Sequence, residues 1–134
     1  MNRLPGRITA VETAGQVRLV DVDVQGHTFS AILLDTSNDL RPGLAVILVF
    51  KETEVSLAKD LSGVISLRNR LASRVRAIDK GRVLSKITLD YLDREVVSVI
   101  TTRSVERLDL KVGDAVEALV KANEMAILHE ESAP

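Results

Sequence analysis

The sequence of 134 residues contains no cysteine and almost no aromatic residues. Without cysteine there can be no disulfide framework, no cysteine-ligated zinc or iron–sulfur site and no thiol nucleophile. The aromatic residues are limited to Phe29, Phe50 and Tyr91, and tryptophan is absent. The core therefore has to be built from valine, isoleucine, leucine and alanine, a composition that favours strands where β-branched residues dominate.

Neither the net charge nor the length of the apolar runs indicates that the protein binds a polyanion or crosses a membrane. The 18 basic and 19 acidic residues give a net charge of −1, so no general field attracts nucleic acid or an anionic surface. The longest uncharged apolar run, residues 44–50, is far shorter than the roughly 20 residues of a membrane helix. The first residues show no apolar signal-peptide segment. We expect a soluble, cytoplasmic protein with no direct membrane insertion.

Six groups of residues recur in the same order along the chain. This recurrence indicates two copies of one small unit. The matched groups are Asn2-Arg3-Leu4 and Asn69-Arg70-Leu71, Arg7 and Arg74, Gly15 and Gly81, Ser30 and Ser98, Leu40-x-x-Gly43 and Leu110-x-x-Gly113, and Lys51-x-x-Glu54 and Lys121-x-x-Glu124. Their spacing varies along the chain, as expected after a duplication when small insertions fall in loops. We predict a first domain at residues 1–63 and a second at residues 64–134.

Each copy is predicted to consist mainly of β-strands. Alternation of apolar and polar residues places Ile8 and Ala10 on one face of the first strand. The predicted strands are 7–11, 20–24, 29–34 and 46–50 in the first copy, and 74–78, 87–91, 96–101 and 115–120 in the second, with hairpin turns at 25–27 and 92–94. Residues 102–110 have helical spacing, and residues 36–40 are their shorter counterpart.

Four to five strands and one short helix in some 60 residues describe a small barrel of the OB type. The predicted fold is thus all-β with short helices, in the form of two tandem OB-like five-stranded barrels. A barrel of this size buries only a marginal core by itself. We therefore expect the two copies, and partner chains, to share apolar surface.

Three motifs stand in order in the second copy: Ser66-Leu67-Arg68-Asn69, Ser98-Val99-Ile100-Thr101 and Leu119-Val120-Lys121-Ala122-Asn123. Their order resembles the molbindin family, the Mop-type or TOBE domains that bind molybdate and tungstate. That family usually opens with Ser-Ala-Arg-Asn and carries a late Val-Lys-Ala. The resemblance covers nearly the whole chain. It implies OB-like barrels, a homo-oligomer and an oxyanion bound at domain or subunit interfaces.

The resemblance also implies a set of oxyanion-binding residues in the second copy: Ser66, Leu67, Arg68, Asn69, Ser98, Thr101, Lys121, Ala122 and Asn123. A tetrahedral oxyanion offers only acceptor oxygens, so its site has to be lined with donors. Arg68 supplies a planar fork and Lys121 a compact ammonium, while hydroxyl, amide and backbone N–H groups supply neutral donors. Such a site needs no metal and no cofactor, since molybdate or tungstate is itself the ligand.

The first copy departs from this pattern. Its expected weaker counterparts are Ser30, Lys51 and Thr53. The Ser-x-Arg part of the motif is missing, Leu33 is matched to Thr101, and Glu52 stands where the second copy has Ala122. We therefore expect a degraded site or a purely structural barrel in this half of the chain.

Some of these residues also have simpler interpretations. Lys121 ends an apolar run, where a lysine that only covers apolar surface is common. Thr101 or Thr102 can cap the helix that follows, and Thr102 is the expected cap. Arg70, Arg74 and Arg76 are expected to lie on a solvated strand face.

The predicted function is molybdate or tungstate binding for intracellular storage, homeostasis or sensing, by a trimer or otherwise a dimer. The alternative is a ligand-free TOBE-like regulatory or assembly module associated with a transporter. Binding of single-stranded nucleic acid is disfavoured, because it needs a basic groove and stacking aromatics. An enzyme is not expected, because no nucleophile–base pair or cluster of metal ligands is present.

Overall fold

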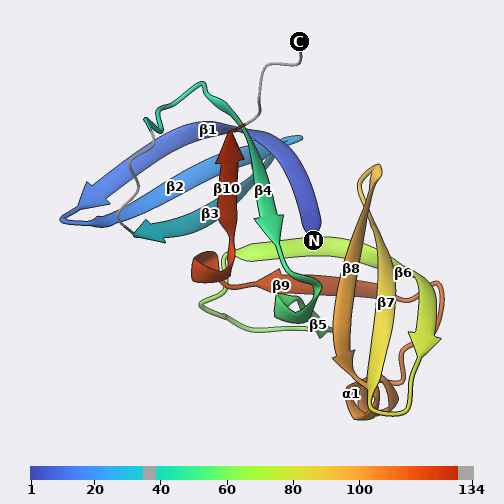
Figure 1. Ribbon diagram of the computed structural model, residues 1–134. Helices are drawn as coiled ribbons and strands as arrows, with labels where there is room; N and C mark the ends of the chain where they lie inside the picture. Colours follow the sequence, from blue (N-terminus) through green and yellow to red (C-terminus); the bar gives the residue numbers. More distant parts are fainter. Residues whose placement is uncertain (35–38, 130–134) are drawn as a thin grey trace.

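The structure, a computed structural model, describes residues 1–34 and 39–129, which form two five-stranded curled sheets (Figure 1). The first half contains β1 (Asn2–Ala14), β2 (Val17–Val24), β3 (His27–Leu34), β4 (Ala45–Phe50), the 3-10 turn η1 (Glu52–Glu54) and β5 (Ser56–Ala58). The second half contains β6 (Asn69–Lys80), β7 (Leu84–Tyr91), β8 (Arg94–Thr101), α1 (Thr102–Leu108), β9 (Ala115–Val120), the 3-10 turn η2 (Ala122–Glu124) and β10 (Ala126–His129). The predicted all-β fold of two five-stranded units is confirmed. The counterpart helix expected at 36–40 lies largely outside the described residues.

The two sheets exchange one strand each. The first sheet has the order β10-β4-β1-β2-β3, and the second has the order β5-β9-β6-β7-β8. Strand β10 runs beside β4, with Ile127 opposite Leu48 (Figure 1), and β5 pairs with β9 in the same way, with Leu57 opposite Ala118. The boundary between residues 63 and 64 stays a prediction, but each sheet takes its fifth strand from the other side of it.

The strand registers give the true alignment of the two copies. Ser30 lies opposite Asp21 on β2, and the residue in the same place on β8 is Val97, opposite Thr88. The match of Ser30 with Ser98 is therefore wrong by one residue, and Ser98 corresponds to Ala31.

The match of Gly15 with Gly81 is also wrong by one residue. Ala14 pairs with Val17 at the end of the first hairpin, and in the second hairpin the residue bonded to Leu84 is Gly81, so Gly81 corresponds to Ala14. The match of Gly43 with Gly113 is confirmed, since their amides bond to Ile8 and Val75 respectively.

Each sheet buries one face in an apolar core, as the alternating pattern predicts, and the core also holds Phe29, Phe50 and Tyr91. Val20, Val22 and Val24 of β2 are at most 1% exposed, and their counterparts on β7 are equally enclosed. The expectation that Ala10 shares a face with the buried Ile8 is wrong, because Ala10 is exposed, and Ala77 repeats this in the second copy. A β-bulge after Ile8, repeated after Val75, shifts the register, and Val11 and Ile78 pack against the core instead.

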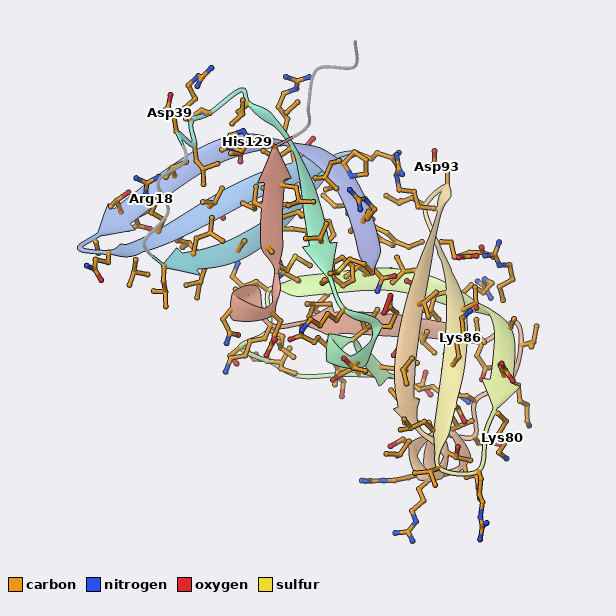
Figure 2. The ribbon with its side chains drawn as sticks, in the orientation of Figure 1. Arg18, Asp39, Lys80, Lys86, Asp93 and His129 are labelled. Atoms are coloured by element: carbon orange, nitrogen blue, oxygen red, sulfur yellow. The ribbon has the colours of Figure 1, made fainter. Side chains whose placement is uncertain are left out.

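The two sheets also meet at their hairpin tips. The Tyr91 ring lies edge-on to His27 and Phe29, with centroids 6.3 and 6.2 Å away. The Gln25 amide donates to the Asp93 carboxylate at 2.9 Å, at the tip of the β7–β8 hairpin (Figure 2). These contacts tie the two copies together.

Candidate functional site

The start of β6 and the end of β9 bring the two predicted cations together. Asn69 pairs with Val120 across these strands, so Arg68 and Lys121 flank the pair at the same end of the sheet. Both side chains are exposed. Among the described residues, neither has a hydrogen-bond or ion-pair partner. We call the residues that meet here the Arg68 corner: residues 66–69, residues 121–123 and Ser30.

The backbone adds donors at the Arg68 corner. The turn η2 follows Lys121, whose carbonyl accepts from the Glu124 N–H at 2.9 Å. Because this bond closes the turn, the N–H groups of Ala122 and Asn123 have no acceptor inside it. The corner thus presents a guanidinium, an ammonium and backbone N–H groups. This is a donor set suited to an anion with several acceptor oxygens.

Asn69 is fully buried and is engaged with the first copy. Its Oδ1 accepts from the Ser30 N–H at 2.8 Å, and its Nδ2 donates to the Ser30 carbonyl at 2.9 Å. The Ser30 hydroxyl in turn donates to the Asp21 carboxylate at 2.7 Å. Ser30 was expected as part of the weaker first-copy site, but the structure places it at the Arg68 corner, with its polar groups already bonded.

A second corner repeats this arrangement with the copies reversed. Asn2 makes two hydrogen bonds of 2.8 Å to the backbone of Val97, and it pairs with Phe50, which precedes Lys51. The turn η1 packs against β8, as η2 packs against β3. We call these residues the Lys51 corner: Met1, Asn2, residues 51–53, Val97 and Ser98.

The Lys51 corner carries a carboxylate that the Arg68 corner lacks. Glu52 forms an ion pair with the amino group of Met1. The hydrogen bond to that amino group holds the pKa of Glu52 below its ordinary value of 4.5, and the positive charge of Lys86 contributes to the same effect. Met1 stands where the second copy has Arg68, and Glu52 stands where it has Ala122. The carboxylate therefore faces the corner.

Two predicted residues do not lie at the Arg68 corner. The buried Ser98 hydroxyl donates to the Val55 carbonyl at 2.7 Å, next to η1. Thr101 lies at the far end of β8, where its hydroxyl oxygen accepts from the Ser104 N–H at 3.1 Å and caps α1. Thr101, not Thr102, is thus the N-cap. Its pairing with Leu84 makes Leu34, rather than Leu33, its counterpart.

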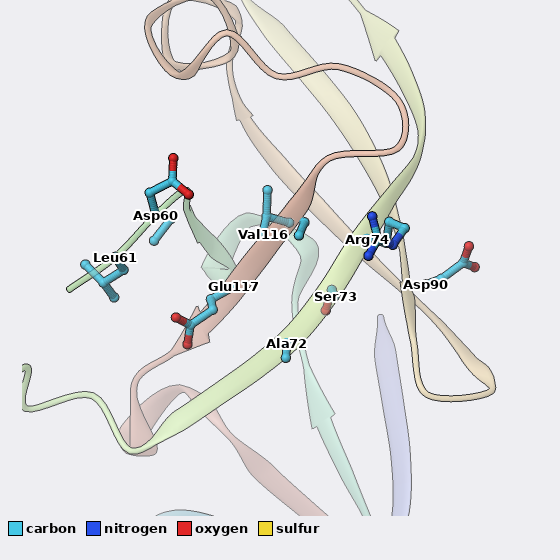
Figure 3. A pocket seen from close by; sticks show the side chains of 10 residues that line it. Asp60, Leu61, Ala72, Ser73, Arg74, Asp90, Val116 and Glu117 are labelled. Atoms are coloured by element: carbon cyan, nitrogen blue, oxygen red, sulfur yellow. The ribbon is translucent and has the colours of Figure 1, made fainter.

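A cavity of about 570 Å³ lies elsewhere, between residues 58–61 and the strands β6 and β9 (Figure 3). Its lining includes the carboxylates of Asp60, Asp90 and Glu117 against one cation, Arg74. The Arg74 guanidinium already donates to the Gly113 carbonyl at 2.8 Å. Because its one lining cation is already engaged and carboxylates supply no donors, the cavity is not a candidate oxyanion site.

The family model of the TOBE domain matches residues 1–57 and again residues 65–127. The molybdenum import ATP-binding protein ModC of Brucella abortus (strain 2308) is 34% identical over 120 residues, which are 89% of this chain and 32% of that protein. The chain thus spans about a third of the length of this relative. Molybdenum-pterin-binding protein 3 of Clostridium pasteurianum is 35% identical over 65 residues, 48% of this chain and 96% of its own length.

A solved structure resembles nearly the whole chain. The cytoplasmic molybdate-binding protein ModG, crystallised with molybdate bound, superposes with a TM-score of 0.89 at 30% identity, and the match covers 94% of each chain. The match covers nearly all of the chain that forms the two sheets and the two corners. No helix of the described residues is long and apolar enough to cross a membrane.

Proposed function

The chain belongs to the TOBE domain family and carries two copies of that domain, and on this premise we propose that it binds molybdate or tungstate at the Arg68 corner. The observation that carries this proposal is the pairing of Asn69 with Val120, which brings Arg68 and Lys121 to one end of the sheet with no carboxylate partner among the described residues. The molybdate-bound ModG structure and the molybdenum-related names of the relatives support this choice of anion.

The proposed site uses donors that remain available. Arg68 and Lys121 supply the positive charge, and the N–H groups of Leu67, Ala122 and Asn123 complete the cage together with the Ser66 hydroxyl. Ser98 and Thr101 lie elsewhere in the same chain, so they take part only if a second subunit brings them to the corner. The protein acts by binding, and no step of catalysis is assigned to it.

Arg68 and Lys121 are exposed to solvent, which suits a site completed at a subunit interface. We propose a cytoplasmic homo-oligomer, a trimer or otherwise a dimer, that serves molybdenum storage, homeostasis or sensing. Light scattering at micromolar concentration tests the assembly. A monomer mass close to 14.6 kDa would contradict it.

A second candidate function is a regulatory module that binds no ligand. The observation that favours it is the match of 89% of this chain to about one third of ModC, a molybdenum import ATP-binding protein. Isothermal titration with molybdate separates the two candidates. Saturable binding of molybdate, with weaker binding of the smaller anion sulfate, supports the oxyanion-binding function. Absence of binding heat, together with no change in thermal stability, supports the regulatory module.

A further inference from the structure

We propose that strand β3 of the first copy positions the oxyanion site of the second copy, and that Asn69 is the positioning residue that connects them. This inference rests on the proposed function, because it concerns what holds Arg68 in place. It also assigns a role to the first copy, in which Glu52 stands in the place of Ala122.

The contact between Asn69 and β3 is specific and enclosed. Strand β3 is an edge of the first sheet, and an edge strand presents backbone N–H and C=O groups that need partners. The Asn69 amide satisfies both groups of Ser30, at 2.8 and 2.9 Å, and Asn69 is 0% exposed. A buried amide with its oxygen and one N–H engaged in this way has a fixed orientation.

The segments that carry Arg68 and Lys121 both contact β3. Arg68 directly precedes Asn69, and its position therefore follows the position of this buried side chain. Lys121 leads into η2, and η2 packs against β3. A shift of β3 relative to β6 would thus change the distance between the two cations. An anion site held by two charges is sensitive to that distance, since the interaction energy varies with separation.

The duplication provides a matched control. Asn2 makes the same pair of hydrogen bonds to Val97, both of 2.8 Å, and it is 5% exposed. Loss of the Asn2 amide removes the same number of bonds between the two copies. It acts, however, at the Lys51 corner and leaves Arg68 and Lys121 untouched.

The test compares Asn69→Ser with Asn2→Ser in the full chain, with thermal unfolding and molybdate titration by calorimetry. We expect both variants to unfold at lower temperature, and only Asn69→Ser to weaken molybdate binding, by about 10-fold, a typical coupling between linked sites. Equal effects on affinity would show that the contact is only structural and overturn the inference. If the unsubstituted protein bound no molybdate, the proposed function itself would fail.

A second measurement needs no variant and remains available if Asn69→Ser fails to fold. Coupling is reciprocal, so a ligand that depends on the Asn69–Ser30 contact must also stabilise it. Added molybdate should slow hydrogen exchange of the Ser30 N–H more than that of the Val97 N–H. Equal slowing at the two amides would contradict a positioning role for Asn69.

Discussion

The guanidinium of Arg70 is held by the carboxylate of Glu117 through two hydrogen bonds, of 2.6 and 2.7 Å. Arg74 bonds to the Gly113 carbonyl, and Arg76 forms ion pairs with acidic residues of β7 and β8. Arg68 has no such partner among the described residues. This difference explains why only Arg68, among four arginines on this stretch of chain, is available to an anion.

The Arg70–Glu117 pair predicts a dependence of stability on pH. The hydrogen bond from Arg70 lowers the pKa of Glu117 below its ordinary value of 4.5, so the unfolded chain binds this proton more readily than the folded one. The stabilisation is therefore present above the ordinary pKa and is lost as the pH falls through the folded value. Urea unfolding of Glu117→Gln should show a modest destabilisation at pH 7 that shrinks toward pH 3. A difference that stays constant over this range would contradict the pair's contribution.

The exposed cations Arg68 and Lys121 predict a contrast between the copies. Arg68→Ala and Lys121→Ala should each weaken molybdate binding about 10-fold or more, because a hydrogen bond to a charged group contributes about 1.5–3 kcal/mol. Lys51→Ala, at the corresponding place in the first copy, should change the affinity little. Calorimetric titration of the three variants measures this. Strong loss in Lys51→Ala with no loss in Lys121→Ala would move the site to the Lys51 corner.

Much of the fold follows from the periodicity of the sequence, but the contacts between the copies do not. The valines of β2 show the period of two that places them in the core. The bulge after Ile8 breaks that period, because an extra residue in one strand leaves no local signal. The exchange of β5 and β10 depends on which strand each one pairs with, and alternation of residues within a strand does not determine its partner.

The sequence predicts the part of the site whose motifs stand at the ends of two adjacent strands, β6 and β9. The order of the family motifs predicts that Arg68 and Lys121 share a site, and the pairing of Asn69 with Val120 places both at one end of the sheet. Their role as ligands stays a prediction. Ser98 was grouped with them because it follows the family order, although β8 packs against η1 of the other copy. The recurrence of Asn2 as Asn69 was the one available signal for the contacts between copies. A hydrogen-bonding role in both was not inferred from it.

A site specific for molybdate or tungstate predicts that these anions raise the unfolding temperature of the protein more than other anions do. An anion that binds only the folded protein raises its stability by about 2.7 kcal/mol at a concentration 100 times its Kd. Molybdate and tungstate should therefore raise the unfolding temperature at concentrations where sulfate has a smaller effect. Scanning fluorimetry at matched ionic strength measures this, with phosphate as an additional control. Equal shifts for all four anions would indicate a non-specific cation pair rather than a molybdate site.

Glu52 and Ala122 occupy equivalent places, and this pair supplies the most direct test of why the second copy carries the site. A carboxylate about 6 Å from a bound anion opposes it by roughly 1.4 kcal/mol per charge at an effective dielectric constant near 40, and by about twice that near 20. Ala122→Glu should therefore weaken molybdate binding about 10-fold or more. Ala122→Gln, of similar size and without the charge, is the control and should retain most of the affinity. Because the effect is electrostatic, the ratio of the two dissociation constants should fall as salt is raised. If the glutamate and glutamine variants lost affinity equally, side-chain bulk at η2 would be the cause, and the absence of a carboxylate would not be what distinguishes the Arg68 corner.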